Sequence, residues 1–152
     1  LSEVRGRFDG VSAQVVVGHG LESSAVSAEI ELGTVKTGNA DRDAHLASSD
    51  FFNAELNPTM TFVSTGISGD DEEFVLAGDL TINGVTKPVE LDVEFFGTSV
   101  FPMDQSTRAG FSATGSISRK DFGITFDVPL GGDKVMIADK VALELDVQLI
   151  AP

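Results

Sequence analysis

The sequence predicts an all-β protein built around an antiparallel sheet. Apolar and polar residues alternate along several stretches of the chain, which is typical of strands with one buried face and one wet face. Short turn signals such as Asn83-Gly84 separate these stretches, and strands joined by short loops pair antiparallel as a meander. One segment, residues 39–53, departs from this alternation.

The alternating stretches are predicted strands. The first clear one runs from Ala25 to Leu32, and the most regular one runs from Val141 to Leu149 near the end of the chain. Alternate residues of a strand point to the same face, so each stretch defines one inward set. In chain order, the predicted inward residues are Val26, Ala28, Ile30 and Leu32; Met60, Phe62 and Ser64; Leu76, Gly78, Leu80 and Ile82; Val89, Leu91, Val93 and Phe95; Phe111, Ala113, Gly115 and Ile117; and Val141, Leu143, Leu145, Val147 and Leu149.

The segment 39–53 is the predicted helix. Asn39 suits the N-cap position, and Asp41 and Asp43 suit the positive end of the helix dipole. The same segment gathers charges, a histidine and the aromatic pair Phe51-Phe52. A segment that differs from the strands around it often carries the function of a β protein, so it is a candidate functional segment.

Composition excludes several classes of partner. The chain has 152 residues, which predicts one domain with a sizeable core. Its formal net charge of -14 repels phosphate backbones, so we expect no nucleic-acid partner. Apolar runs of only a few residues predict that the protein is not an integral membrane protein. The eleven phenylalanines, without tyrosine or tryptophan, suit a dry interior.

The residues that catalysis needs are sparse. His19 and His45 are the only histidines, there is no cysteine, and no zinc-motif spacing or G-x-S-x-G sequence occurs. Asp41 and His45 are four residues apart and can form an ion pair on one helix face. We interpret that pair as part of a cap and salt-bridge arrangement rather than as an acid/base dyad. We therefore expect no enzyme, no metal and no conventional cofactor.

Four blocks of the sequence, in order, resemble the YceI-like, or polyisoprenoid-binding, family. The most recognisable stretch runs from Thr37-Gly38-Asn39 through residues 42–46 and 49–52 to Pro58 and residues 61–64. The other blocks are residues 4–8, residues 78–88, and Gly110-Phe111 together with residues 119–123. The resemblance covers nearly the whole chain, and several ordered blocks are more specific than any single one.

The resemblance implies an extended, lipocalin-like antiparallel β-barrel of about eight strands, with the helical segment near one end. It also implies a hydrophobic lipid ligand, of the polyisoprenoid or isoprenoid quinone type, held in an elongated apolar cavity. The resemblance implies a bacterial protein, since many relatives are exported to the bacterial periplasm or beyond and others are cytoplasmic. The implied location is the periplasm or the exterior if an upstream signal peptide was removed, and otherwise the cytoplasm.

Family members usually open with a strand that precedes the block at residues 4–8. This chain begins almost at that block, so we expect residues 1–152 to form a single barrel domain without the family's N-terminal strand. Another segment or another subunit would then complete the sheet, and a homodimer is compatible with this expectation.

Small residues on the predicted inward faces have two interpretations. Ala13, Ala28, Gly78, Ala113 and Gly115 either leave volume for a ligand or mark tight bends or close sheet packing. The predicted ligand-lining residues are Phe8, Val15, Val17, Ile30, Phe62, Leu80, Leu91, Phe111, Ala113 and Ile117.

The family-marker segment has a predicted structural role. Arg42, Asp43 and His45 are expected to pin the helical segment across the barrel as a structural clasp, with Arg42 paired to a carboxylate. The alternative to lipid binding is a stress-associated structural or interaction domain whose barrel interior is closed.

Overall fold

The computed structural model describes residues 5–126, 129–131, 134–135 and 138–151. Its one α-helix in this part of the chain is α1 (Ala40–Ala47), and short 3-10 helices are η1 (Leu21–Ser23), η2 (Leu32–Thr34) and η3 (Arg119–Phe122). The strands are β1 (Arg7–Phe8), β2 (Val11–Val16), β3 (Ala25–Glu31), β4 (Val35–Lys36), β5 (Thr59–Gly69), β6 (Glu73–Ile82), β7 (Val85–Val100), β8 (Thr107–Ser118), β9 (Pro129–Gly131), β10 (Lys134–Val135) and β11 (Lys140–Ile150).

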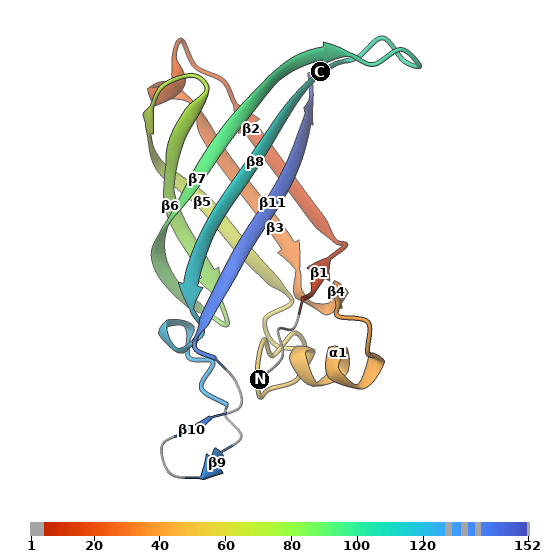
Figure 1. Ribbon diagram of the computed structural model, residues 1–152, viewed down its shortest axis with the longest axis vertical. Helices are drawn as coiled ribbons and strands as arrows, with labels where there is room; N and C mark the ends of the chain where they lie inside the picture. Colours follow the sequence, from red (N-terminus) through yellow and green to blue (C-terminus); the bar gives the residue numbers. More distant parts are fainter. Residues whose placement is uncertain (1–4, 127–128, 132–133, 136–137, 152) are drawn as a thin grey trace.

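Seven strands form one antiparallel sheet in the order β11-β8-β7-β6-β5-β3-β2. Each strand pairs with the next long strand along the chain, so the predicted meander is confirmed. The sheet curls into a half-barrel, and β2 and β11 are its two edges among the described residues (Figure 1). The small pairs β1-β4 and β9-β10 lie outside this sheet.

The register places the predicted apolar sets on one face of the sheet. Directly opposite residues of antiparallel strands share a face. One row across the sheet joins Ala28, Phe62 and Leu80, and the buried Phe62 and Leu80 belong to the hydrophobic core. Exposure alternates along β11 in step with the sequence. The all-β prediction is therefore confirmed. Leu143, Leu145, Val147 and Leu149 are half-buried as predicted, whereas Val141, at the start of the strand, is 39% exposed.

The hairpin between β6 and β7 follows the expected turn chemistry. Asn83 and Gly84 have φ angles of 54° and 73°, in the left-handed region that a tight hairpin turn requires. The hydroxyl groups of Thr81 and Thr86 hydrogen-bond at 2.7 Å across the turn. This turn fixes the register of the two strands.

The predicted helical segment contains one short helix. The N-terminus of α1 is capped by Asn39, whose side-chain oxygen accepts a hydrogen bond from the backbone N–H of Arg42 at 3.1 Å. The helix ends at Ala47, and the chain then turns back, with the N–H of Phe52 bonded to the carbonyl of Leu46 at 3.0 Å. Residues 48–53 are therefore turns rather than a continuation of the helix.

The two ends of the half-barrel differ. At the end near α1, apolar side chains close the core, and Phe51, Phe122 and Ile124 are only 8%, 1% and 5% exposed. The opposite end carries the β5-β6 and β7-β8 hairpins and the end of β11 (Figure 1). No helix of the described residues is long and apolar enough to cross a membrane.

Candidate functional site

The inner face of the curled sheet carries apolar side chains that remain partly exposed. Along β11, four inward residues are half-buried, while the residues between them are exposed and polar. Half-buried inward residues also occur on β3, β7 and β8. These half-buried inward residues are Val26, Ala28, Ile30, Val89, Leu91, Phe95, Phe111, Ile117, Leu143, Leu145, Val147 and Leu149.

Most of the predicted lining residues gather on this face. Phe62, Leu80 and Ala113 are buried members of the core. Leu91, Phe111 and Ile117 pack against that core and stay partly exposed. Six of the ten predicted residues therefore belong to one apolar assembly.

The other four predicted residues lie at the margin. Val15 and Ile30 are half-buried, Val15 on the edge strand β2 and Ile30 on its neighbour β3. Phe8 lies in β1, outside the seven-stranded sheet, and its ring contacts Phe52 edge-on at a centroid distance of 5.7 Å. Val17 follows the end of β2 and is 79% exposed. Alternation of apolar residues does not indicate that β2 ends at Val16, so the prediction of Val17 as a lining residue is wrong.

Two of the small inward residues mark close packing. A Cβ atom on Gly78 would overlap the Phe62 ring, and one on Gly115 would lie 2.7 Å from Cδ2 of Leu91. At these two positions the space that a side chain would fill is already occupied by a neighbour. The close-packing interpretation therefore holds for both glycines.

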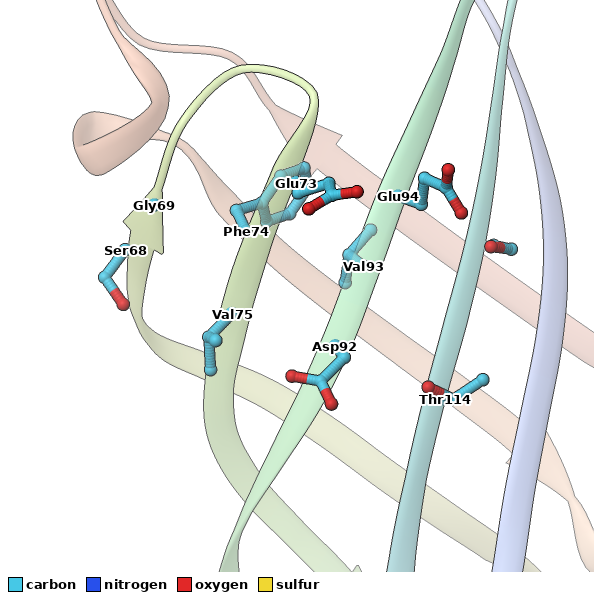
Figure 2. A pocket seen from close by; sticks show the side chains of 10 residues that line it. Ser68, Gly69, Glu73, Phe74, Val75, Asp92, Val93, Glu94 and Thr114 are labelled. Atoms are coloured by element: carbon cyan, nitrogen blue, oxygen red, sulfur yellow. The ribbon is translucent and has the colours of Figure 1, made fainter.

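A depression of about 410 Å³ lies over β5 to β8, and its exposed polar side chains belong to the outer face (Figure 2). Carboxylates and hydroxyls line it, including Glu73, Asp92, Glu94 and Thr114. Glu73 on β6 and Glu94 on the adjacent strand β7 are directly opposite each other. Like charges in this position repel each other, so these carboxylates are better placed in water than against a ligand. No group of three or more His, Asp or Glu in the described residues is arranged to hold a metal ion.

Two of the three predicted clasp residues, Arg42 and Asp43, converge on Thr37. Arg42 donates two hydrogen bonds of 2.8 Å, from Nε to the Thr37 hydroxyl and from Nη2 to the Thr37 carbonyl. Asp43 accepts two more, from the Thr37 N–H at 2.9 Å and from the Thr37 hydroxyl at 2.5 Å. The expected carboxylate partner of Arg42 is thus replaced by a threonine that Arg42 and Asp43 share.

His45 connects α1 to the closed end of the core. Its Nε2 lies 2.9 Å from Oδ2 of Asp50, so the partner is Asp50 and not Asp41, because the chain folds back after the helix. The imidazole ring also contacts Phe51 and Phe126 edge-on, at centroid distances of 5.0 and 5.1 Å. His45 therefore holds the aromatic groups that close this end.

Sequence reasoning assigned no role to Arg119, which is 5% exposed. Its Nε donates to the carbonyl of Ala138, and its Nη1 donates to the carbonyls of Ile124 and Phe126, each at 2.9 Å. A planar guanidinium with five donors is suited to holding several carbonyls at once. In the sequence, Arg119 is marked only by its place in the family block at residues 119–123, and the resemblance implies no particular role for it.

A carboxylate beside Arg119 joins the end of β8 to the start of β11. The Ser118 hydroxyl donates to Asp139 at 2.6 Å, and the backbone N–H of Lys120 donates to it at 3.1 Å. The hydrogen bond from Ser118 and then that from Lys120 hold the pKa of Asp139 below its usual value.

Comparison with known proteins gives the family. The model of the YceI-like domain matches residues 1–149. Protein YceI of Escherichia coli O157:H7 is 45% identical over 103 residues, which are 68% of this chain and 53% of that protein. A UPF0312 protein of Pectobacterium carotovorum gives the same identity and coverage. The chain spans about half the length of these curated relatives.

Solved structures agree with this assignment. A YceI protein of Campylobacter jejuni superposes with a TM-score of 0.87 at 32% identity, covering 100% of this chain and 87% of that one. BcnA of Burkholderia cenocepacia has a TM-score of 0.81 at 23% identity, covering 95% and 86%, and this shows the shared fold alone. Because the family model spans residues 1–149 and the fold agrees, the chain belongs to the YceI-like domain family.

Proposed function

We propose that this protein binds a long apolar lipid, of the polyisoprenoid or isoprenoid quinone type, against the inner face of its half-barrel. The observation that carries the proposal is the row of half-buried leucine and valine side chains along β11, from Leu143 to Leu149. Folded proteins normally cover such a continuous apolar surface. The YceI-like family and its barrel fold support a lipid-binding role at the level of the family.

Such binding needs no strong polar contact. Each buried carbon contributes about 0.8 kcal/mol, so one five-carbon isoprene unit contributes about 3 to 4 kcal/mol before ordering costs are subtracted. A few units would outweigh the loss of freedom of the chain. Recognition would then depend on the length and shape of the tail.

The headgroup of the lipid is expected at the end opposite α1. The α1 end is filled by Phe51, Phe122 and Ile124. The side chains of Arg42 and Asp43 are engaged with Thr37, which supports a structural rather than a headgroup-binding role for them. The tail would lie inside with its free end toward α1.

A domain with a closed interior and no lipid is the second candidate. The observation in its favour is the occupied space at Gly78 and Gly115. A further strand could come from another segment or from a second copy. Paired with the edge strands β2 and β11, it would close the barrel and so shield the inner face from solvent. Such a domain would have a structural or interaction role.

Native mass spectrometry and organic extraction of the purified protein test the proposal. A co-purifying long-chain lipid is the expected result. Leu145→Gln places an amide on the inner face and should lower lipid content, whereas Glu144→Gln places the same amide on the outer face and should not. A protein that carries no lipid and captures no added polyprenol, or equal losses in both variants, would refute the proposal.

A further inference from the structure

The half-barrel carries its lysines and arginines at one end. Connections in an antiparallel meander alternate between the two ends of the sheet, so residues 17–24, 70–72 and 101–106 form the end opposite α1, here called the distal end (Figure 1). Of the ten Lys and Arg residues, only Arg108 lies at the distal end. The other nine lie in or beside β1, β4, α1, η3 and β10, or within the first three residues of β7 and β11.

Arg108 is engaged by neighbours within the protein. Its Nε donates to the Ser106 hydroxyl at 3.0 Å, its Nη1 donates to Oε1 of Gln148 at 3.1 Å, and its Nη2 donates to Oδ2 of Asp104 at 3.1 Å. The guanidinium also lies 3.9 Å from the centre of the Phe101 ring, and the side chain is only 17% exposed. The one arginine of the distal end is therefore already paired with a carboxylate.

The connections at the distal end carry further carboxylates. Asp70, Asp71 and Glu72 form the β5-β6 turn, and Glu22 lies in η1, between β2 and β3. The Asp70 carboxylate accepts hydrogen bonds from the backbone N–H groups of Glu73 at 2.8 Å and Glu72 at 2.9 Å. The bond from Glu73 and then that from Glu72 lower the pKa of Asp70, which is therefore ionised at neutral pH.

The inner face beside these connections is uncharged. The rings of Phe95 and Phe111 stack at a centroid distance of 5.0 Å, and the Phe74 ring meets Phe111 edge-on at 6.5 Å. Phe111 is paired with Phe95 on β7 and with Val147 on β11, so one apolar row crosses three strands. The next inward row toward the distal end consists of Thr98, Ala109 and Leu149.

We propose that the bound lipid has an uncharged headgroup, so that the protein takes up polyprenols or prenyl quinones and rejects prenyl phosphates. This inference rests on the proposed function, which puts the headgroup at the distal end. A phosphate beside the apolar rows would lose hydration without gaining a cation. A phosphate monoester carries about -1.5 to -2 charges at pH 7, so the carboxylates of the β5-β6 turn would also repel it.

An uncharged headgroup avoids both costs. Water at the distal end can hydrogen-bond a hydroxyl group or a quinone carbonyl, and a flat ring can lie against the Phe95-Phe111 pair. The repulsion of an anion acts over about one Debye length, roughly 8 Å at physiological ionic strength. Selectivity between the two headgroups should therefore weaken as salt is added.

Capture of a polyprenol and of its monophosphate, with the same tail, tests the inference. Each lipid is offered separately to the full chain, which is then reisolated, extracted with organic solvent and measured by mass spectrometry. Wild-type protein should capture the polyprenol at least about tenfold better than the monophosphate at low ionic strength, because only the monophosphate is repelled. The ratio should fall at high salt.

Asp71→Lys/Glu72→Lys reverses two exposed charges of the turn and keeps the Asp70 carboxylate that caps it. This variant should capture several-fold more monophosphate than wild type and the same amount of polyprenol. The matched control Glu55→Lys/Asp121→Lys makes the same change in net charge with exposed residues at the α1 end, and it should leave the ratio unchanged. Circular dichroism confirms that both variants are folded.

Equal capture of the two lipids by wild-type protein, or a preference for the monophosphate, would overturn the headgroup inference alone. The same conclusion follows if Asp71→Lys/Glu72→Lys gains no monophosphate capture or if both variants gain equally, since net charge rather than its location would then decide. Wild-type protein that captures neither lipid would refute the proposed function as well. The two failures therefore give different results.

Discussion

The ring of Phe62 on β5 lies over the Cα of Gly78 on β6, in the space that a side chain at position 78 would occupy. Across the sheet, Gly78 is paired with Ser64 on β5 and with Val89 on β7. A small residue here allows a large neighbour to lie flat against the sheet. The glycine and the phenylalanine therefore act as one packing unit.

Gly78→Ala should destabilise the protein by about 1–3 kcal/mol, because the added methyl group forces Phe62 or the backbone to move. Gly110→Ala on β8 is the matched control. The nearest atom to its added Cβ is the Cβ of Phe96, 4.0 Å away, so the methyl group fits without displacing a neighbour. Urea unfolding measures both free energies of unfolding. Equal effects of the two substitutions would show that Phe62 does not fill the space.

Asp43→Ala should destabilise the protein by about 1–3 kcal/mol, because the Thr37 N–H and hydroxyl lose their acceptor in a half-buried site. Asp41→Ala removes an exposed carboxylate from the same first turn of α1 and should cost less than about 1 kcal/mol. Thermal unfolding followed by circular dichroism compares them. If Asp41→Ala were the more harmful change, the helix dipole rather than the clasp would be the important factor.

Arg42→Ala should lower stability, and it should lower lipid content only as far as the folded fraction falls, if the clasp is structural. Arg42→Lys should restore little, because an ammonium group does not reproduce the two bonds that the guanidinium makes to Thr37. The measurement pairs urea unfolding with organic extraction. Unchanged stability with complete loss of lipid would instead indicate headgroup contact.

The strands were predictable because their periodicity is local. The inward set of β11, from Leu143 to Leu149, follows from alternation alone and the structure has the same set. The Asn83-Gly84 turn is likewise determined by two adjacent residues that tolerate positive φ. Such patterns do not depend on the rest of the chain.

The contacts that close the α1 end were not predictable in the same way. Arg119 reaches the carbonyl of Ala138, which is 19 residues further along the chain. His45 pairs with Asp50 because the chain reverses after α1, and residue spacing on a regular helix pointed instead to Asp41. Each contact depends on where loops travel in space, which local propensity does not determine.

Ala113→Phe should reduce the capture of an added long-chain polyprenol. Ala113 is buried on the inner face, opposite Val93 on one side and Leu145 on the other. A phenyl ring there would occupy space on the inner face and cost about 1–3 kcal/mol through overpacking. Thr114→Phe places the same ring on the outer face and is the control. Unchanged capture by folded Ala113→Phe protein would refute the assignment of this face.

Asp139→Asn should destabilise the protein at neutral pH and progressively less in acid. The hydrogen bonds from Ser118 and Lys120 lower the pKa of Asp139 from its ordinary value of 3.8. A lowered pKa in the folded state means that the stabilisation is fully present above 3.8 and is lost as the pH falls through the folded-state pKa.

Urea unfolding of wild type and Asp139→Asn, at neutral pH and at several pH values below 3.8, measures this difference. Asp9, Asp70 and Asp104 also have lowered pKa values, but they are present in both proteins and their effects cancel in the comparison. Ser118→Ala should reproduce part of the pH dependence, because it removes the largest cause of the shift. A difference that stays constant into acid would mean that the asparagine acts through packing and not through the ionised carboxylate.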